Sequence, residues 1–534
     1  MDRAYDAREH DKLPPLAWLL DVSPGLHRPV LHHGPHVELF DSGFFEGGWD
    51  GDFARADFDR SANVFGSGAK VDSTSATFVP QSHTVESLTF FSGNRLCAVS
   101  NSVAFICAYS GCDLEPTDWR SGERFAAITQ GLNHAVQTLR FRNGVLTVVY
   151  HHNFVVVDGA LNQVTPKVLP PQFENFASYS GYLLKTARAV CNNAACSGRI
   201  RRYESLVAAV SSGYDSSAAA VIASMLGCHE AISLRLSQRG DPDSGAKLAE
   251  LLGMDLQEFE REESVSRLDA TVAEFLCAGT QGEDYVYRAF QDVLPGKVLF
   301  TGFGGDNVWT KGNPPTVDLK RMDLTGNSMG EFRISRDYVV LPVPYIGCLR
   351  HPCLHRIANS AEMAPFSVGG DYDRPIPRRI VESAGIPRDA FARRKRAASL
   401  VFYSQLSLLS KNVRTQVAAF EKRLRLSWRD RALSRLLVAR WYVGNALFRG
   451  FKRLTRLRGQ RLPPVKLLRP IGRIGASVLS RIFGPYEVFE HGHPRNAILQ
   501  RWAISLVKVR YLCVTRPTAS HLQCGRATAG DQAK

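Results

Sequence analysis

The residues from 206 to 223 include types that could do chemistry on a phosphate group. Residues 206–210 are apolar and typical of a strand, residues 211–213 form a polar turn, and an Ala-rich segment with good helix propensity follows. This order aims backbone N–H groups and the positive end of a helix dipole at an anion. Asp215 would repel a phosphate unless a divalent cation such as Mg²⁺ lies between them. We therefore expect a pyrophosphate group, with N–H donors in residues 211–213, to be bound by Ser211, Ser212, Gly213, Asp215, Ser216 and Ser217; a serine-rich helix cap is the alternative.

A second apolar segment ends in a similar turn. Residues 297–301 are typical of a strand, and three glycines follow before Asp306. Asp306 lies 91 residues after Asp215, which leaves room for roughly two more strand–helix units. Because strands alternate with helices in this part of the chain, we expect a parallel, doubly wound sheet with its ligand at the carboxyl edge.

Together the two turns resemble those of the ATP pyrophosphatases that form acyl-adenylates, in particular asparagine synthetases and β-lactam synthetases. The first turn matches their Ser-Gly-Gly-x-Asp-Ser loop, with Ser212 in place of a glycine. The second is similar to Ser-Gly-x-Gly-x-Asp-Glu, with Phe303 where the families have Glu or Tyr and Asn307 where they have Glu. Since Phe303 cannot exchange a proton, any acid/base role of that position is absent here.

The resemblance implies a set of roles for individual residues. Asp215 and Asp306 would together hold Mg²⁺ on the pyrophosphate of ATP. Thr301 and Gly302 match the positions whose backbone lies along the adenosine, and Leu236 matches a position beside the adenine. The implied cofactors are therefore ATP and Mg²⁺.

Three more segments resemble the same family. Lys395, in a basic stretch near residues 388–398, matches a Lys that reaches the adenylate; a solvated basic helix face is the alternative. Residues 490–511 resemble the terminal helix of a bacterial group of asparagine-synthetase-like proteins, and residues 101–109 resemble a segment of that group's N-terminal half. In glutamine-hydrolysing relatives this half is a glutaminase that needs Cys after the initiator Met. Because Asp2 stands there, we expect a degenerate domain without glutaminase activity.

The pattern and the resemblance predict an α/β chain in five parts. Residues 1–185 would form a β-rich α+β domain of the degenerate glutaminase type, with a hairpin turn at residues 142–144 and with loops and short strands over residues 43–68. Residues 186–400 would form the doubly wound, ATP-binding PP-loop synthetase domain. Residues 401–485 would be a basic helical insert, residues 486–511 the C-terminal helix of the synthetase domain, and residues 512–534 a disordered tail.

Charge is concentrated in the insert. The chain of 534 residues has a net charge of +15, but residues 422–481 hold 17 Lys and Arg against one acid, Asp430, so the remainder is close to neutral. Three interpretations of this segment stay open: amphipathic helices that pack on the synthetase domain, a peripheral contact with an anionic membrane surface, and an arm that binds nucleic acid. The 11 cysteines are an odd number without a small-scaffold spacing, so we expect reduced thiols and a cytoplasmic location, with membrane contact as the alternative.

These features predict an ATP-dependent amide-forming ligase that resembles asparagine synthetase. A small-molecule carboxylate would be adenylated with release of pyrophosphate, and ammonia or an amine would then displace AMP. Aspartate, giving asparagine, is the default substrate. Alternatives are another acyl substrate in specialised or surface-polymer biosynthesis, suggested by Asp2, Phe303 and Gly347, a PP-loop enzyme that adenylates tRNA, or a non-catalytic ATP-binding protein. A homodimer is an open alternative to a monomer.

Overall fold

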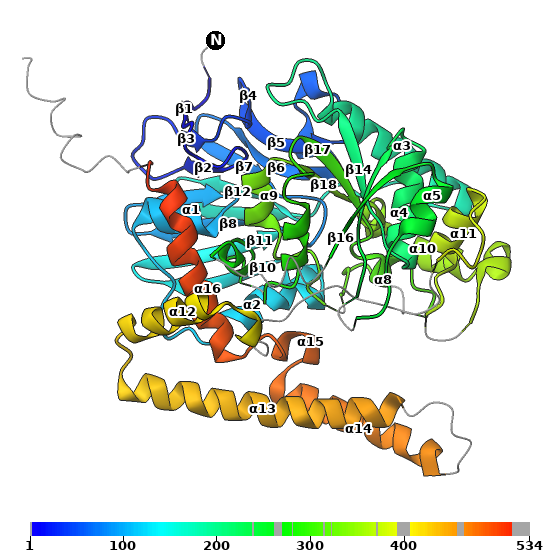
Figure 1. Ribbon diagram of the computed structural model, residues 1–534. Coiled ribbons are helices and arrows are strands. Elements are labelled where there is room, and N and C mark those ends of the chain that lie inside the picture. Colours follow the sequence, from blue (N-terminus) through cyan, green and yellow to red (C-terminus); the bar gives the residue numbers. More distant parts are fainter. Residues whose placement is uncertain are drawn as a thin grey trace, which may run out of the picture.

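The computed structural model describes residues 3–237, 240–260, 270–279, 281–312, 316–321, 323–369, 372–391, 406–456 and 464–514, with the side chains of 454–456 and 464–473 excepted (Figure 1). In these residues the chain is a mixed α/β protein. A β-rich N-terminal region precedes a parallel sheet, and helices form most of the C-terminal part. Lys395 and residues 515–534 lie outside the described residues.

The N-terminal region consists of two sheets. The first has the order β1-β3-β2-β9-β8-β11-β10, with strands β1 (Asp6–Glu9), β3 (Val30–His33), β2 (Trp18–Asp21), β9 (Cys97–Ser100), β8 (Ser87–Gly93), β11 (Gly144–Tyr150) and β10 (Val136–Phe141). The second has the order β13-β12-β7-β6-β5-β4, with strands β13 (Ala160–Thr165), β12 (Asn153–Val157), β7 (Ser75–Val79), β6 (Val64–Val71), β5 (Gly43–Trp49) and β4 (Glu38–Phe40). One core, which includes Trp18, Phe44, Phe78, Phe90 and Val149, joins the facing sides of both sheets.

Residues 43–68 are largely strand, so the prediction of loops and short strands was wrong for this segment. β5 and β6 are antiparallel partners along their length. Their glycines allow the backbones to approach closely: a Cβ on Gly66, which has φ +155°, would lie 1.9 Å from the carbonyl oxygen of Glu46. The hairpin predicted at residues 142–144 is confirmed, since β10 and β11 pair up to Phe141 and Gly144, with Asn143 at φ +63°.

The later sheet is entirely parallel, with the order β16-β15-β14-β17-β18. Its strands are β16 (Asp255–Phe259), β15 (Glu230–Leu234), β14 (Ser205–Ala209), β17 (Lys297–Thr301) and β18 (Val339–Pro342). The first strand in the chain, β14, is central, and the order reverses between β14 and β17. Ligands of open parallel sheets bind beyond the carboxyl ends of the strands at such a reversal.

Both faces of the parallel sheet are covered, as the alternation along its strands requires. Val298 and Phe300 pack in one core with α3 (Phe176–Ala194), α4 (Tyr214–Ser224) and α11 (Pro375–Ser383). Leu299, between them, packs in the other core with α7 (Val272–Leu276), α9 (Gly330–Arg336) and α16 (Pro494–Val507). The remaining helices near the sheet are α5 (Ala246–Leu251), α8 (Gly305–Val308) and α10 (His351–Ala358). Buried strands with apolar residues on both faces are typical of parallel sheets.

The N-terminal sheets are tied to the later part of the chain by a buried ion pair. The Arg333 guanidinium of α9 donates to both carboxylate oxygens of Glu46 on β5, at 2.7 and 2.9 Å, and to Glu86 at 2.9 Å. Arg333 and Glu46 are almost fully buried. Because each charge depends on the other in this environment, the contact fixes how β5 and α9 pack.

The C-terminal helices are α12 (Lys411–Arg423), α13 (Trp428–Arg456), α14 (Pro464–Phe483), α15 (Tyr486–Phe489) and α16, while α1 (Val103–Ser110) and α2 (Ser121–Ala126) belong to the N-terminal region. α13 and α14 lie side by side as a hairpin along the lower edge of the molecule in Figure 1. Among the described residues, no helix combines the length and the apolar character needed to cross a bilayer.

Candidate functional site

The two Gly-rich turns meet beyond the carboxyl ends of β14 and β17. A Cβ on Gly302 would lie 2.5 Å from the backbone carbon of Asp215, and a Cβ on Gly305 would lie 2.3 Å from the Asp215 carboxylate carbon. Only glycine permits this approach, because both distances are far below ordinary van der Waals contact. Asp215, in the first turn of α4, and Asp306, in α8, are thereby brought to one place at the reversal of strand order.

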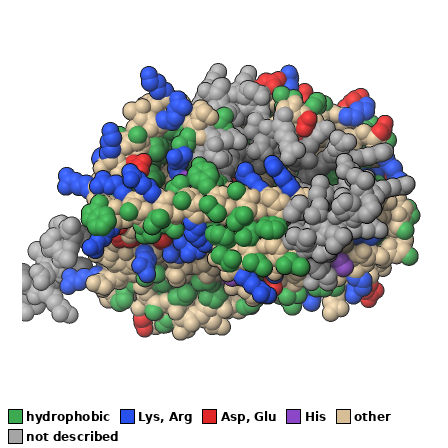
Figure 2. All heavy atoms as spheres, turned by 90° about the horizontal axis from the view of Figure 1, so that it is seen from below, with side chains coloured by type: hydrophobic (Ala, Val, Ile, Leu, Met, Phe, Trp, Pro, Cys, Tyr) green, Lys and Arg blue, Asp and Glu red, His purple; other side chains and the backbone are tan. Residues whose placement is uncertain are grey.

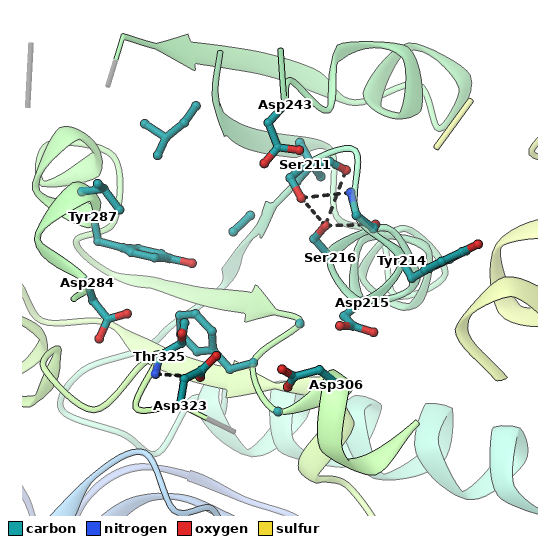
Figure 3. Close-up of a pocket in the computed structure, with 18 of the residues that line it drawn as sticks. Ser211, Tyr214, Asp215, Ser216, Asp243, Asp284, Tyr287, Asp306, Asp323 and Thr325 are labelled. Carbon is teal, nitrogen blue, oxygen red and sulfur yellow. Dashed lines mark hydrogen bonds between the residues drawn. The ribbon is translucent and has the colours of Figure 1, made fainter. Parts of the chain in front are cut away.

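Both acids line a pocket of about 240 Å³. One end of the pocket is formed by Ile232, Ser233 and Leu234 of β15, and the other by aromatic and acidic residues from outside the sheet. Figure 3 shows Asp215 and Asp306 on one side of it, across from Tyr287 and Asp284.

The serine turn is held by its own hydrogen bonds. Ser211 Oγ lies 2.7 Å from Ser216 Oγ and accepts from the N–H of Gly213, and Ser217 Oγ donates to the Gly213 carbonyl oxygen at 2.7 Å. The Ser212 N–H donates to the carbonyl oxygen of Asp243 at 3.2 Å. The N–H groups of residues 212 and 213 are therefore already used, contrary to the expectation that residues 211–213 donate to an anion. The first-turn N–H groups of α4, which have no partner within the helix, are the donors that the fold leaves for this purpose.

Ser212, the departure from the glycine pattern, does not narrow the pocket. Its hydroxyl donates to the Asp243 carboxylate, and its side chain is not part of the pocket lining. A Cβ at this position is accommodated because it points toward the segment after β15 rather than toward the cavity.

Arg374, to which the sequence assigns no role, forms an ion pair with Asp215. Only 5% of its side chain is exposed, and its guanidinium lies 4.7 Å from the centre of the Tyr372 ring. Burial lowers the pKa of Arg374, but the charges of Asp215 and Asp306 raise it more, so that the net shift is upward. Among the described residues its buried Nε has no hydrogen-bond acceptor. No spacing signals this residue, because 159 positions separate it from Asp215 and only the fold joins them.

The far side of the pocket is aromatic and acidic. The Phe303 ring lies 5.7 Å from that of Tyr287. Asp284 accepts from the N–H groups of Gly326 and Ser328 at 2.8 and 3.1 Å, and burial raises its pKa. Arg321 is already committed, since its guanidinium donates to the carbonyl oxygens of Thr84 and Thr325 and to the side chain of Asn327.

The remaining predicted residues are placed as follows. Gly302 lines the pocket, whereas Thr301 is buried at the end of β17 and outside the lining. Leu236 pairs with Pro242 beyond β15, and Leu234 instead lines the pocket. Asn307 lines it and donates to the Asp306 carboxylate at 3.4 Å, where the Glu of the resembled pattern would add a like charge.

The described lining carries six carboxylates, those of Asp215, Asp243, Glu283, Asp284, Asp306 and Asp323, against two arginines that are both engaged by protein groups. Such a pocket needs a cation to bind a triphosphate. In the described part of the chain no three His, Cys, Asp or Glu residues are grouped as metal ligands. Mg²⁺ is usually held by one or two carboxylates plus substrate phosphates, so Asp215 and Asp306 fit an ion that arrives with a nucleotide.

Comparison of the chain with protein-family models and with curated proteins finds no match in either case.

Proposed function

We propose that this protein is an ATP-dependent ligase of the asparagine synthetase type, which activates a carboxylate as an acyl-adenylate. The observation that carries the proposal is the contact of the two glycine turns, which puts Asp215 and Asp306 on one pocket at the reversal of strand order. Two separate strand–turn–acid segments converge there, as in the resembled family. The parallel sheet and the β-rich N-terminal region agree with a PP-loop domain and a glutaminase-like domain.

The pocket offers suitable surroundings for each part of ATP. Ile232 and Leu234 provide an apolar wall for the adenine, in the role assigned by resemblance to Leu236. The α4 N-terminus and the unsatisfied Nε of Arg374 would bind phosphate oxygens. When bound, Mg²⁺ would neutralise charge on the pyrophosphate, and Asp215 and Asp306 would hold it.

In the proposed reaction a carboxylate oxygen of the substrate attacks the α-phosphorus of ATP. The bond to the bridging oxygen breaks, and pyrophosphate leaves with its electron pair. Arg374 would offset the charge that develops on the departing oxygens. Ammonia or an amine then attacks the acyl carbon, loses a proton and displaces AMP. Lys395 would assist at the adenylate, in the role that the resemblance assigns to it.

The far side of the pocket favours a substrate that carries positive charge beside an apolar body. Asp323 and Asp284 lie there with the rings of Phe303 and Tyr287, and a free aspartate would bring two more negative charges to them. We therefore propose an amine-bearing substrate over aspartate, the default of the resemblance. This is the alternative of a different ligase reaction in specialised or surface-polymer biosynthesis.

ATP–pyrophosphate exchange tests the proposal. Purified protein with Mg²⁺ is assayed against a panel of carboxylic acids that includes aspartate and amino-substituted acids. We expect exchange with at least one acid and its loss in Asp306→Asn and Asp215→Asn, which keep side-chain size. Exchange that persists in both variants would rule out the assigned roles of these acids.

A second candidate is a nucleotide-binding protein without turnover, and the Arg374–Asp215 ion pair is the observation that favours it. An arginine that stays on Asp215 would take the place of one metal contact. In that case ATP would bind equally well with Mg²⁺ and with the chelator EDTA, and no acid in the panel would support exchange.

A further inference from the structure

The α13–α14 hairpin has an apolar face that no described residue covers. On α13 the exposed apolar residues include Leu436, which is 68% exposed, together with Val443 and Leu447. On α14 they are Ile474, Val478 and Ile482. Figure 2, which views the molecule from the hairpin side, shows apolar side chains along this surface with Lys and Arg around them.

The opposite side of the hairpin is packed against the molecule. Trp441 and Phe448 are buried, and the indole N–H of Trp441 donates to the Glu490 carbonyl oxygen at 3.1 Å. The two helices also touch closely, since a Cβ on Gly475 of α14 would lie 2.2 Å from the Phe451 ring of α13. The outer face is therefore held in a fixed orientation by the packing of the inner face.

The exposed apolar residues form regular stripes. Leu436, Val443 and Leu447 are spaced by seven and four positions, so they share one side of α13, nearly opposite Trp441 and Phe448. Ile474, Val478 and Ile482 recur every four positions on α14. A helix that only packed on a protein body would carry polar residues on its outer side.

Arginines border the stripe of α13. Arg431, Arg435, Arg449 and Arg453 are exposed, and their spacing places them along one edge of the stripe. Residues 422–481 hold 17 Lys and Arg against one acid. The surface thus combines apolar side chains in the middle with positive charge at the margin.

We propose that this outer face docks the protein on the surface of an anionic lipid bilayer. The helices would lie in the plane of the membrane, with the apolar stripes below the headgroups and the arginines at the level of the lipid phosphates. A second copy of the chain is disfavoured as the occupant, since two surfaces of the same strong positive charge would face each other. Nucleic acid would use the arginines but gain little from Leu436, Val443 and Ile474. The proposal is independent of the proposed function, because it concerns residues outside the pocket.

The test is flotation of the full chain with vesicles of phosphatidylcholine alone and of phosphatidylcholine with one-third phosphatidylglycerol. We expect binding to the anionic vesicles only, weakened by added salt. Leu436→Ser/Val443→Ser/Ile474→Ser should weaken it at least about tenfold, and Arg431→Gln/Arg435→Gln by a similar factor. The matched controls change residues exposed elsewhere, Val168→Ser/Leu169→Ser/Ile200→Ser and Arg140→Gln/Arg142→Gln, and should bind as the parent does.

Thermal unfolding of each variant shows that it is folded, because the substituted side chains are exposed. Failure to bind anionic vesicles would overturn the proposal, as would equal binding to both vesicle types. Retention of binding by the Ser variant would show that the apolar stripes are not the contact. A gel-shift assay with RNA covers the remaining outcome: RNA binding unaffected by the Ser variant, without vesicle binding, would assign the face to nucleic acid.

Discussion

Gly305→Ala is the substitution that most selectively probes the contact between the two turns. The new Cβ would lie 2.3 Å from the carboxylate carbon of Asp215, and ordinary contact begins near 3.4 Å. The Asp215 carboxylate must therefore move by about 1 Å. Because it is the end of a side chain, it can move while the backbone stays in place. Gly305 is not among the residues with positive φ, so its backbone accepts Ala.

The expected effect is large on chemistry and small on folding. A misplacement of about 1 Å in a reacting group can cost about 100-fold in rate, equivalent to about 2.7 kcal/mol of transition-state stabilisation. Overpacking at the site should lower the free energy of unfolding by about 1–3 kcal/mol. Gly302→Ala should be worse for folding, since its Cβ would meet the backbone of Asp215 and Ser216.

Two assays with one control separate these effects. Calorimetric titration with Mg²⁺ and ATP measures binding, and ATP–pyrophosphate exchange measures turnover. Gly312→Ala is the control, because a Cβ there meets nothing within 4 Å. We expect the control to match the parent. If Gly305→Ala binds ATP and exchanges as well as Gly312→Ala does, the position of Asp215 does not matter and the reasoning is refuted.

Three further predictions concern buried charges. Arg374→Gln leaves Asp215 without its partner and should lower the free energy of unfolding by about 3 kcal/mol in urea titrations, with Arg374→Lys intermediate; an unchanged midpoint would contradict the ion pair. Glu46→Gln should cost about 3 kcal/mol through the loss of its pair with Arg333, and a cost near zero would mean that this contact does not join β5 to α9. Burial lowers the pKa of Lys167 from 10.5 to about 7. The unfolded chain then binds more protons between these values, so stability should rise with pH across that window by about 1.4 kcal/mol per pH unit. Lys167→Met should remove this slope in unfolding midpoints taken at neutral and alkaline pH, and an equal slope in both proteins would contradict the assignment.

The sequence was most informative where local signals agree. The apolar run before Ser211 and the one before Asp306 are both strands that end in turns, because apolar runs bounded by Gly and Ser signal strand ends. The turn at Asn143 was recognisable since Asn and Gly accept the positive φ that a two-residue hairpin needs. These signals depend only on neighbouring residues.

What the sequence could not provide depends on contacts between distant segments. Gly47 and Gly66 read as loop residues, but they are required where β5 and β6 approach closely. The pairing of Arg374 with Asp215 has no sequence signal. On α13 the apolar residues predicted to pack lie on two sides of the helix: Trp441 is buried, whereas Leu436 is exposed. Periodicity identifies an amphipathic helix but does not tell which apolar side faces the protein.

The central claim is that ATP is cleaved between its α- and β-phosphates in the pocket shared by Asp215 and Asp306. The most direct measurement is the nucleotide product formed when the protein, Mg²⁺ and ATP are incubated with the small-molecule fraction of a cell extract. Our account predicts AMP and pyrophosphate in equal amounts, and none above background with Asp306→Asn. Formation of ADP and phosphate, or AMP formation that Asp306→Asn leaves unchanged, would contradict it.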